Sequence, residues 1–133
     1  LPVEITDSSG DMSVEGVRVV RITDSSGDIT ARRLPADVEI NDSSGDVRVE
    51  DAAGAVRVED SSGDVVIRGA KSVHIPQDSS GDMIIERIAG GVTIDRDSSG
   101  DVFVSDVGGN VEFIADGSGL VRVTDVKGTV RLP

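Results

Sequence analysis

Short runs of alternating apolar and polar residues recur along the whole chain. In the clearest of them, residues 47–50 read Val-Arg-Val-Glu, and residues 56–59 repeat the same four residues. Alternation with a period of two is typical of a β-strand with one buried face, and the Val and Ile that fill the apolar positions favour extended backbone. Polar clusters separate the runs, and no stripe with a helical period is present. The pattern therefore predicts an all-β chain of short strands without helices.

The polar clusters follow a second, longer period. The pentapeptide Asp-Ser-Ser-Gly-Asp occurs six times, at spacings of 17 to 19 residues. The copies begin at Asp7, Asp24, Asp42, Asp60, Asp78 and Asp97, and a degenerate seventh copy occupies residues 116–120. Each unit divides into two halves of turn plus strand, as SSGDVRVED and AAGAVRVED at residues 43–60 show. A unit repeated at a fixed period indicates a stacked repeat architecture.

Two short strands cannot bury an apolar face alone, but identical units can stack their inward Val and Ile residues into one continuous core. We therefore expect residues 1–133 to form a single domain, a two-faced parallel β-solenoid (β-helix) of about seven rungs with 17 to 19 residues each. The typical inward residues are Val47, Val49, Val56 and Val58. Right-handed coiling is the default for parallel crossovers. A meander of antiparallel hairpins is the competing fold, because its turns are equally short.

Charge order favours the solenoid over the meander. If equivalent residues stack, one outward column reads Glu15, Arg32, Glu50, Arg68, Glu86, Ser105 and Thr124. The column on the opposite face reads Arg21, Glu39, Arg57, His74, Thr93, Glu112 and Arg131. Opposite charges on adjacent strands stabilise a sheet by about 0.2 to 1 kcal/mol, and like charges destabilise it. The alternating sign predicts that residues one repeat apart, and not half a repeat apart, are neighbours.

Composition narrows the functional classes. The chain has no Cys, Tyr or Trp and only two Phe, so the core must be aliphatic and thiol chemistry is excluded. The net charge of -12 argues against nucleic acid or an anionic membrane as a partner. The sequence has no run of 18 apolar residues, so it predicts no membrane-spanning helix. The only histidine, His74, has no second His or Cys to complete a site, and we expect it at the surface or at a strand irregularity. Without a nucleophile and its base, we expect no enzymatic activity.

The acidic residues concentrate in the repeated turn. The six pentapeptides hold twelve of the 25 Asp and Glu residues, and the remaining 13 balance the 13 Lys and Arg residues. Carboxylates stacked about 4.8 Å apart repel by about 1 kcal/mol per neighbour in water, so some interaction must offset the repulsion. The simplest interpretation is turn chemistry, in which Asp accepts a backbone N–H and Gly adopts a positive φ. The other half-turn bends without a fixed sequence, so bending alone does not require the pentapeptide.

Calcium binding would give the repeated turn a further role, because cations would neutralise stacked carboxylates. The candidate ligands are Asp24, Asp28, Asp42, Asp46, Asp60, Asp64, Asp78 and Asp82. The turn departs from the calcium-binding nonapeptide G-G-x-G-x-D-x-U-x, because Ser replaces the first Gly and the acidic turns lie on one edge only. Hydrogen bonds from serine hydroxyls and turn amides are the other means of stabilising a carboxylate column.

Three outward positions are apolar. Six residues after the first Asp of the turn, three successive rungs carry Val66, Ile84 and Phe103. Exposed apolar patches often mark contact surfaces, so these residues are candidates for contact with a partner or with a second copy of the chain, side to side.

The ends of a solenoid expose unpaired strand edges. Pro2 and Pro133 cannot donate to a strand ladder, and Leu120 replaces the second Asp of the last turn, which we interpret as modest blunting of the ends. No capping helix is predicted, so end-to-end stacking into a filament is a further hypothesis.

The repeated residues resemble a bacterial adhesin-like family of β-strand repeats, in which D-x-S-G-[DS]-[IV]-x-[VI] alternates with V-x-G-x-[VI]-x-[VI]. Matching stretches are DSSGDV at residues 60–65 and 97–102, DVGGNV at 106–111 and DVKGTV at 125–130. The resemblance covers essentially the whole chain and carries over no site residue. It implies an extracytoplasmic, non-enzymatic module of the bacterial envelope or cell surface. We expect such a module to present its Asp/Ser turn ladder to a protein or glycan partner, with a calcium-binding module and a self-polymerising filament as the alternatives.

Overall fold

The structure, a computed structural model, describes residues 3–7, 9–16, 18–78, 81–97, 100–116 and 119–131, and these ranges contain fifteen strands and no helix. The odd-numbered strands are β1 (Val3–Asp7), β3 (Val19–Asp24), β5 (Val38–Asp42), β7 (Ala55–Asp60), β9 (Ser72–Asp78), β11 (Val92–Asp97), β13 (Val111–Asp116) and β15 (Val130–Arg131). The even-numbered strands are β2 (Met12–Glu15), β4 (Ile29–Leu34), β6 (Val47–Ala52), β8 (Val65–Ala70), β10 (Met83–Ile88), β12 (Val102–Val107) and β14 (Val121–Val126).

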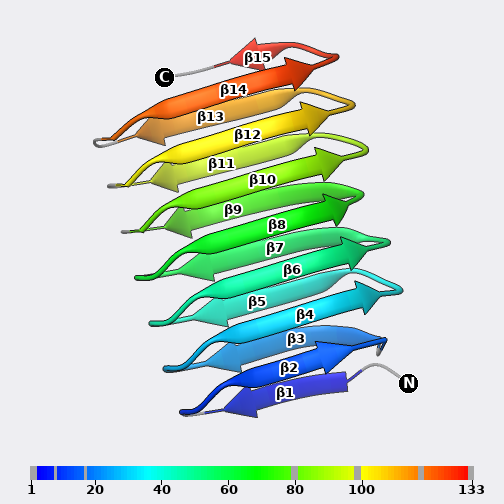
Figure 1. Ribbon diagram of the computed structural model, residues 1–133, viewed down its shortest axis with the longest axis vertical. Helices are drawn as coiled ribbons and strands as arrows, with labels where there is room; N and C mark the ends of the chain where they lie inside the picture. Colours follow the sequence, from blue (N-terminus) through cyan, green and yellow to red (C-terminus); the bar gives the residue numbers. More distant parts are fainter. Residues whose placement is uncertain are drawn as a thin grey trace.

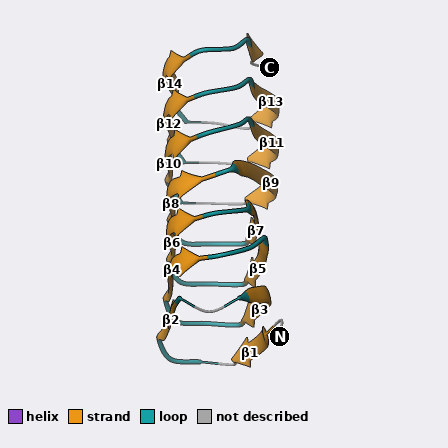
Figure 2. Cartoon of the chain, turned by 90° about the vertical axis from the view of Figure 1, so that its right-hand side faces the viewer, coloured by secondary structure: helices purple, strands orange, loops and turns teal. Residues whose placement is uncertain are grey.

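The strands form two parallel sheets that face each other. The odd-numbered strands make an eight-stranded sheet and the even-numbered strands a seven-stranded sheet, in chain order (Figure 1). In Figure 1 the chain rises from the N-terminus, and the even-numbered strands run toward the right. Figure 2 views the molecule from that right-hand side and shows the even-numbered strands on the left, so they lie in front of the odd-numbered strands in Figure 1. This arrangement is right-handed. The predicted two-faced parallel solenoid is confirmed, and the hairpin meander is excluded.

The core between the sheets is aliphatic, as the composition requires. Val47 and Val49 from β6, and Val56 and Val58 from β7, are at most 1% exposed. Val47 pairs directly with Val65 of the next rung, so equivalent residues lie in columns. Each rung therefore covers the apolar surface of its neighbours, which supplies the hydrophobic burial that a single rung lacks.

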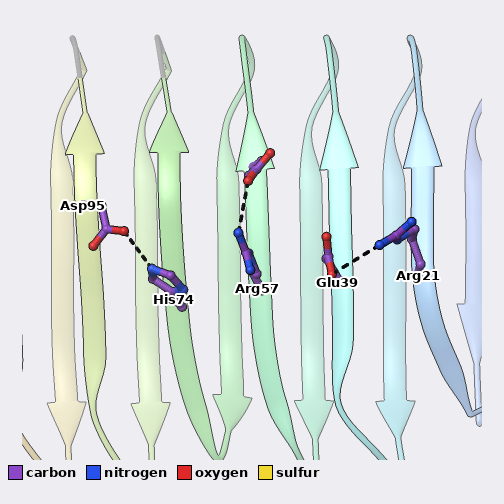
Figure 3. Close-up of polar contacts among 6 residues, drawn as sticks. Arg21, Glu39, Arg57, His74 and Asp95 are labelled. Carbon is purple, nitrogen blue, oxygen red and sulfur yellow. Dashed lines mark hydrogen bonds and ion pairs between the residues drawn. The ribbon is translucent and has the colours of Figure 1, made fainter.

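The outward residues form the predicted charge columns. The column of the even-numbered sheet pairs in register from Glu15 to Thr124, and that of the odd-numbered sheet from Arg21 to Arg131. Ion pairs join Arg21 to Glu39 at 3.9 Å (Figure 3), Arg32 to Glu50 at 4.0 Å and Arg68 to Glu86 at 3.7 Å. Because these side chains are largely solvated, each pair contributes at most about 1 kcal/mol. They report the register more than they stabilise the fold.

His74 lies on the outer face of β9 at the predicted irregularity. The register between β7 and β9 shifts between Arg57 and Glu59, next to His74. Nε2 of His74 lies 2.9 Å from Oδ2 of Asp95, and the two side chains meet above the odd-numbered sheet (Figure 3). The His74 side chain is 42% exposed, so it belongs to the open face of the sheet and not to an enclosed site.

Candidate functional site

The repeated pentapeptide connects each odd-numbered strand to the next even-numbered strand. In the turn after β7, Oδ1 of Asp60 accepts the Ser62 N–H at 3.2 Å, and Gly63 has a φ of 105°. The turn after β3 repeats this contact between Asp24 and Ser26 at 3.3 Å. Both features are those that the turn-chemistry interpretation predicts. The pentapeptide is therefore, first of all, a turn that Asp closes and Gly permits.

Each pentapeptide turn also packs against the turn of the preceding rung. A Cβ atom at Gly63 would overlap the carbonyl oxygen of Gly45. The hydroxyl of Ser62 donates to the carbonyl of Ser43 at 3.3 Å, and the same bond occurs one rung earlier. Serine hydroxyls were one of the possible donors to the stacked carboxylates, and the hydroxyls of Ser44 and Ser62 donate to the backbone of the preceding turn. Only glycine allows this close contact between two backbones.

The eight candidate calcium ligands separate into two columns. In the four turns that hold these ligands, the first Asp ends an odd-numbered strand and is at most 5% exposed. We call these residues the inner Asp column: Asp24, Asp42, Asp60 and Asp78. In the same four turns, the second Asp follows the glycine and is exposed. We call these residues the outer Asp column: Asp28, Asp46, Asp64 and Asp82.

The outer Asp column is a ladder of hydrogen bonds from backbone to side chain. The Asp64 N–H donates to Oδ1 of Asp46 at 3.0 Å, and the Asp82 N–H donates to Oδ1 of Asp64 at 2.9 Å. The same bond recurs along residues 11–120 and ends at the Leu120 N–H. Each carboxylate thus accepts one amide of the next rung, which offsets repulsion between neighbours as predicted for turn amides. The side chain of Leu120 has no oxygen that could accept a further amide and extend the ladder.

Of the residues expected to blunt the ends, Pro2 and Pro133 lie outside the described residues. Leu120 is 50% exposed, and its N–H donates to Oδ1 of Asp101 at 3.0 Å. Leu120 therefore stops the carboxylate ladder while keeping its own backbone bond.

Burial gives the inner Asp column different electrostatics. Burial, followed by the neighbouring carboxyls of Asp42 and Asp78, raises the pKa of Asp60 to about 8. Burial and the Asp24 carboxyl raise the pKa of Asp42 to about 7. One oxygen each of Asp24 and Asp60 is buried without a hydrogen-bond partner. The Ser43 and Ser44 amides lower the pKa of Asp42 by less than burial raises it, and neither carboxyl oxygen of Asp42 has a partner at full hydrogen-bond geometry. The carboxyl groups of Asp42 and Asp60 therefore carry less negative charge at neutral pH than the formal count assigns.

The inward position of these residues has a sequence signal that our interpretation of the turn missed. Asp60 follows Val56 and Val58 at the same period of two, so the alternation that places both valines inside also places Asp60 inside. Asp42, which follows Val38 and Ile40, repeats the pattern. We assigned each Asp to the turn because of its residue type, whereas its position in the strand decides its burial.

A polar groove of about 380 Å³ runs along the edge beside the inner Asp column. It is lined by serines of three turns and by outward side chains of the odd-numbered sheet, among them Asn41, Glu59 and Gln77. In the part of the chain that the structure describes, no group of three or more His, Cys, Asp or Glu side chains could hold a metal ion. Calcium binding by the eight Asp residues therefore remains a prediction from the sequence.

The apolar stripe of Val66, Ile84 and Phe103 is continuous, as its spacing predicts. Ile84 pairs in register with Val66 on one side and with Phe103 on the other. All three side chains are half-buried. Arg48 precedes the stripe and Arg122 follows it in the same column. The contact role of the stripe remains a prediction.

These features define the class of the protein: a right-handed parallel β-solenoid whose rungs interlock at one Asp- and Ser-rich edge. A family model described as Toastrack DUF4097 matches residues 2–83, more than half of the chain, and the chain belongs to this family of adhesin-like β-repeats of unknown function. Comparison with curated proteins and with solved structures gives no match. Among the described residues, no helix has the length and apolar character needed to cross a membrane.

Proposed function

We propose that this solenoid is a non-catalytic structural or adhesive module of the bacterial envelope or cell surface, which presents its Asp/Ser edge to a protein or glycan partner. The outer Asp column carries the proposal, because it places one exposed carboxylate on each of four successive rungs and holds it by a bond to the next rung. The exposed serines Ser25, Ser43 and Ser61 repeat beside it. Such a row of fixed polar groups is preorganised for an extended partner, since little side-chain freedom is lost on binding.

Repetition supports a role without catalysis. Acid–base catalysis uses groups at one place whose environments separate their pKa values, whereas each pentapeptide turn offers the same groups as the next. His74 is the residue best suited to proton transfer near neutral pH, and it contacts Asp95 on an open sheet face. A location outside the cytoplasm is supported by the resemblance to adhesin-like repeats.

Binding of the purified domain to isolated bacterial cell envelopes tests the proposal. The informative variant replaces the four outer residues Asp28, Asp46, Asp64 and Asp82 with Asn, whose Oδ1 can still accept the amide of the next rung. We expect saturable binding by the unchanged domain and a loss of about tenfold in affinity for the variant, which corresponds to about 1.4 kcal/mol.

The matched control removes the same number of negative charges from the sheet faces, by replacing Glu39, Glu50, Glu86 and Glu112 with Gln. We expect this control to bind envelopes as the unchanged domain does. Equal losses of affinity in the Asn variant and in this control would mean that net charge, and not the outer Asp column, determines binding. Absence of saturable binding by the unchanged domain would contradict the proposal.

The apolar stripe is a second candidate contact surface, because three apolar side chains lie in register between two arginines. An Ile84→Glu variant tests it in the same experiment. Loss of envelope binding would assign the stripe to the partner. A lower mass in light scattering at high protein concentration would assign it to association between copies. If neither quantity changes, the stripe is removed from the proposal.

A further inference from the structure

The inner Asp column presents an electrostatic problem that the binding role does not explain. Asp24, Asp42 and Asp60 lie in register on β3, β5 and β7, at the strand spacing of about 4.8 Å. Their side chains are 2%, 5% and 2% exposed. A buried carboxylate is costly unless a proton, a cation or several hydrogen bonds neutralise it.

No positive charge neutralises this part of the column. The charged groups around it are also acidic: Asp28 and Asp46 in the adjacent turns, Asp78 in the next rung and Glu59 in the groove. Glu59 itself pairs with Arg57 at 3.4 Å. From the opposite sheet, strands β4, β6 and β8 begin with the apolar residues Ile29, Val47 and Val65. No ion pair of Asp24, Asp42 or Asp60 occurs among the described residues.

The hydrogen bonds of the turn satisfy the column only in part. Asp24 and Asp60 each accept one serine amide, which leaves one oxygen of each without a partner. The Ser43 and Ser44 amides lower the pKa of Asp42 by less than burial raises it, and neither oxygen of Asp42 has a partner at full hydrogen-bond geometry. The nearest groups in the same column are other carboxyls. A carboxylate cannot donate a hydrogen bond, but a protonated carboxyl can, and the bond between the two is short and strong.

We propose that the inner Asp column is a proton-sharing spine, in which protonated carboxyls of Asp42 and Asp60 donate hydrogen bonds to the neighbouring carboxyls of the column, so that the stack loosens when these protons are lost. The proposal goes beyond the binding role, because these side chains are buried beneath the edge that would contact a partner. It makes the domain a pH-responsive rod, tighter in mildly acidic surroundings than in alkaline ones.

The direction of the pH effect follows from the pKa values. The pKa of Asp60 is about 8 and that of Asp42 about 7 in the folded domain, both well above the ordinary aspartate value of 3.8. The folded state therefore holds protons that the unfolded chain releases, and stability falls as the pH rises from about 4 to about 8. Each such group raises the unfolding equilibrium constant by up to about tenfold per pH unit between pH 5 and 7.

Urea unfolding between pH 5 and 9 tests the proposal on the unchanged domain and on Asp60→Asn, with Asp42→Asn as a second variant should the first not fold. We expect the unfolding equilibrium constant of the unchanged domain to rise with pH. In the Asn variant, the rise of this constant per pH unit should be smaller by a factor of up to about ten. Asp64→Asn, in the outer Asp column, is the matched control and should keep the full slope. His74→Gln removes the one other side chain that ordinarily titrates in this range.

A direct readout completes the experiment. The infrared C=O stretch of protonated carboxyl groups should be present at pH 6, should disappear above pH 9, and should be weaker in Asp60→Asn. An unchanged pH slope in Asp60→Asn, or absence of the protonated band at pH 6, would overturn the proposal. So would a rise in the urea midpoint on adding millimolar calcium at pH 6 that Asp60→Asn abolishes, because a cation and not a proton would then neutralise the column.

Discussion

The two edges of the solenoid bend the chain in different ways. The pentapeptide edge uses glycines with φ values from 93° to 112°, beyond the left-handed region that other residues tolerate. The opposite edge also bends through one residue of positive φ per rung, but its φ values are 52° to 58° wherever the residue is not glycine. Those residues are Arg33, Asp51, Arg87, Asp106 and Asp125. A left-handed bend of this milder kind does not require glycine.

The contact between rungs explains why only one edge has a fixed sequence. At the pentapeptide edge, the Cα of Gly63 sits against the carbonyl of Gly45, where a side chain has no room. At the opposite edge, Arg33 and Arg87 extend into solvent, and close backbone contacts occur on some rungs only, as at Gly54, Gly108 and Gly128. Backbone bonds such as that from the Ala53 N–H to the Leu34 carbonyl, at 2.8 Å, hold successive rungs there. Sequence identity between repeats is therefore enforced where the same close backbone contact recurs from Gly27 to Gly119, and not wherever the chain turns.

The largest test of this contrast is Gly63→Ala. The added Cβ would overlap backbone of the preceding rung and would also demand an unfavourable φ, so we expect a loss of more than about 3 kcal/mol in unfolding free energy, or failure to fold. Gly10→Ala is the matched control, because Gly10 has a φ of 93° but nothing within 4 Å of its added Cβ. We expect the control to lose about 1 to 2 kcal/mol in urea unfolding. Equal losses would show that φ alone fixes the glycine.

Substitution of Asp64, the second Asp of the same turn, should have an intermediate effect on the unfolding free energy. Asp64→Ala removes the acceptor of the Asp82 N–H and should cost about 1 kcal/mol of unfolding free energy, since the exposed amide can bond to water instead. Asp64→Asn keeps an acceptor and removes one negative charge from the outer Asp column, so its stability should equal or exceed that of the unchanged domain. Urea unfolding at pH 7 separates the two. A destabilised Asn variant would mean that the ladder depends on charge.

The sequence was sufficient to predict the structural features that recur in every rung. The alternation around Val47 and Val49 predicted which residues lie inside, and the sign order of Glu50, Arg68 and Glu86 predicted the register, because both depend on side-chain identity at a fixed period. The burial of Asp60 was equally accessible from its place in the alternation, but the raised pKa depends on stacked carboxyls and on the depth of the turn. Those are properties of the assembled stack.

The opposite edge was predictable from residue types only in part. Arg33, Asp51 and Arg87 occupy one equivalent position with a left-handed backbone, yet arginine has no preference for that conformation. The hydrogen bonds between rungs impose it. Gly or Asp occupies this position on the other five rungs and marks it in part, whereas at Arg33 and Arg87 register overrides local propensity.

The smallest expected change in unfolding free energy tests whether the left-handed backbone of Arg87 at the opposite edge is strained. Arg87 has a φ of 58°, so Arg87→Gly relieves left-handed strain of about 1 to 2 kcal/mol but adds unfolded-state entropy worth about 0.5 to 1 kcal/mol. We expect a net stabilisation of about 0.5 kcal/mol in urea unfolding. Arg48→Gly, on the exposed face of β6, has no such strain to relieve and should lose about 0.5 to 1 kcal/mol. If both substitutions destabilise equally, the left-handed residue is not strained, and the contrast between the edges rests on the contact between rungs alone.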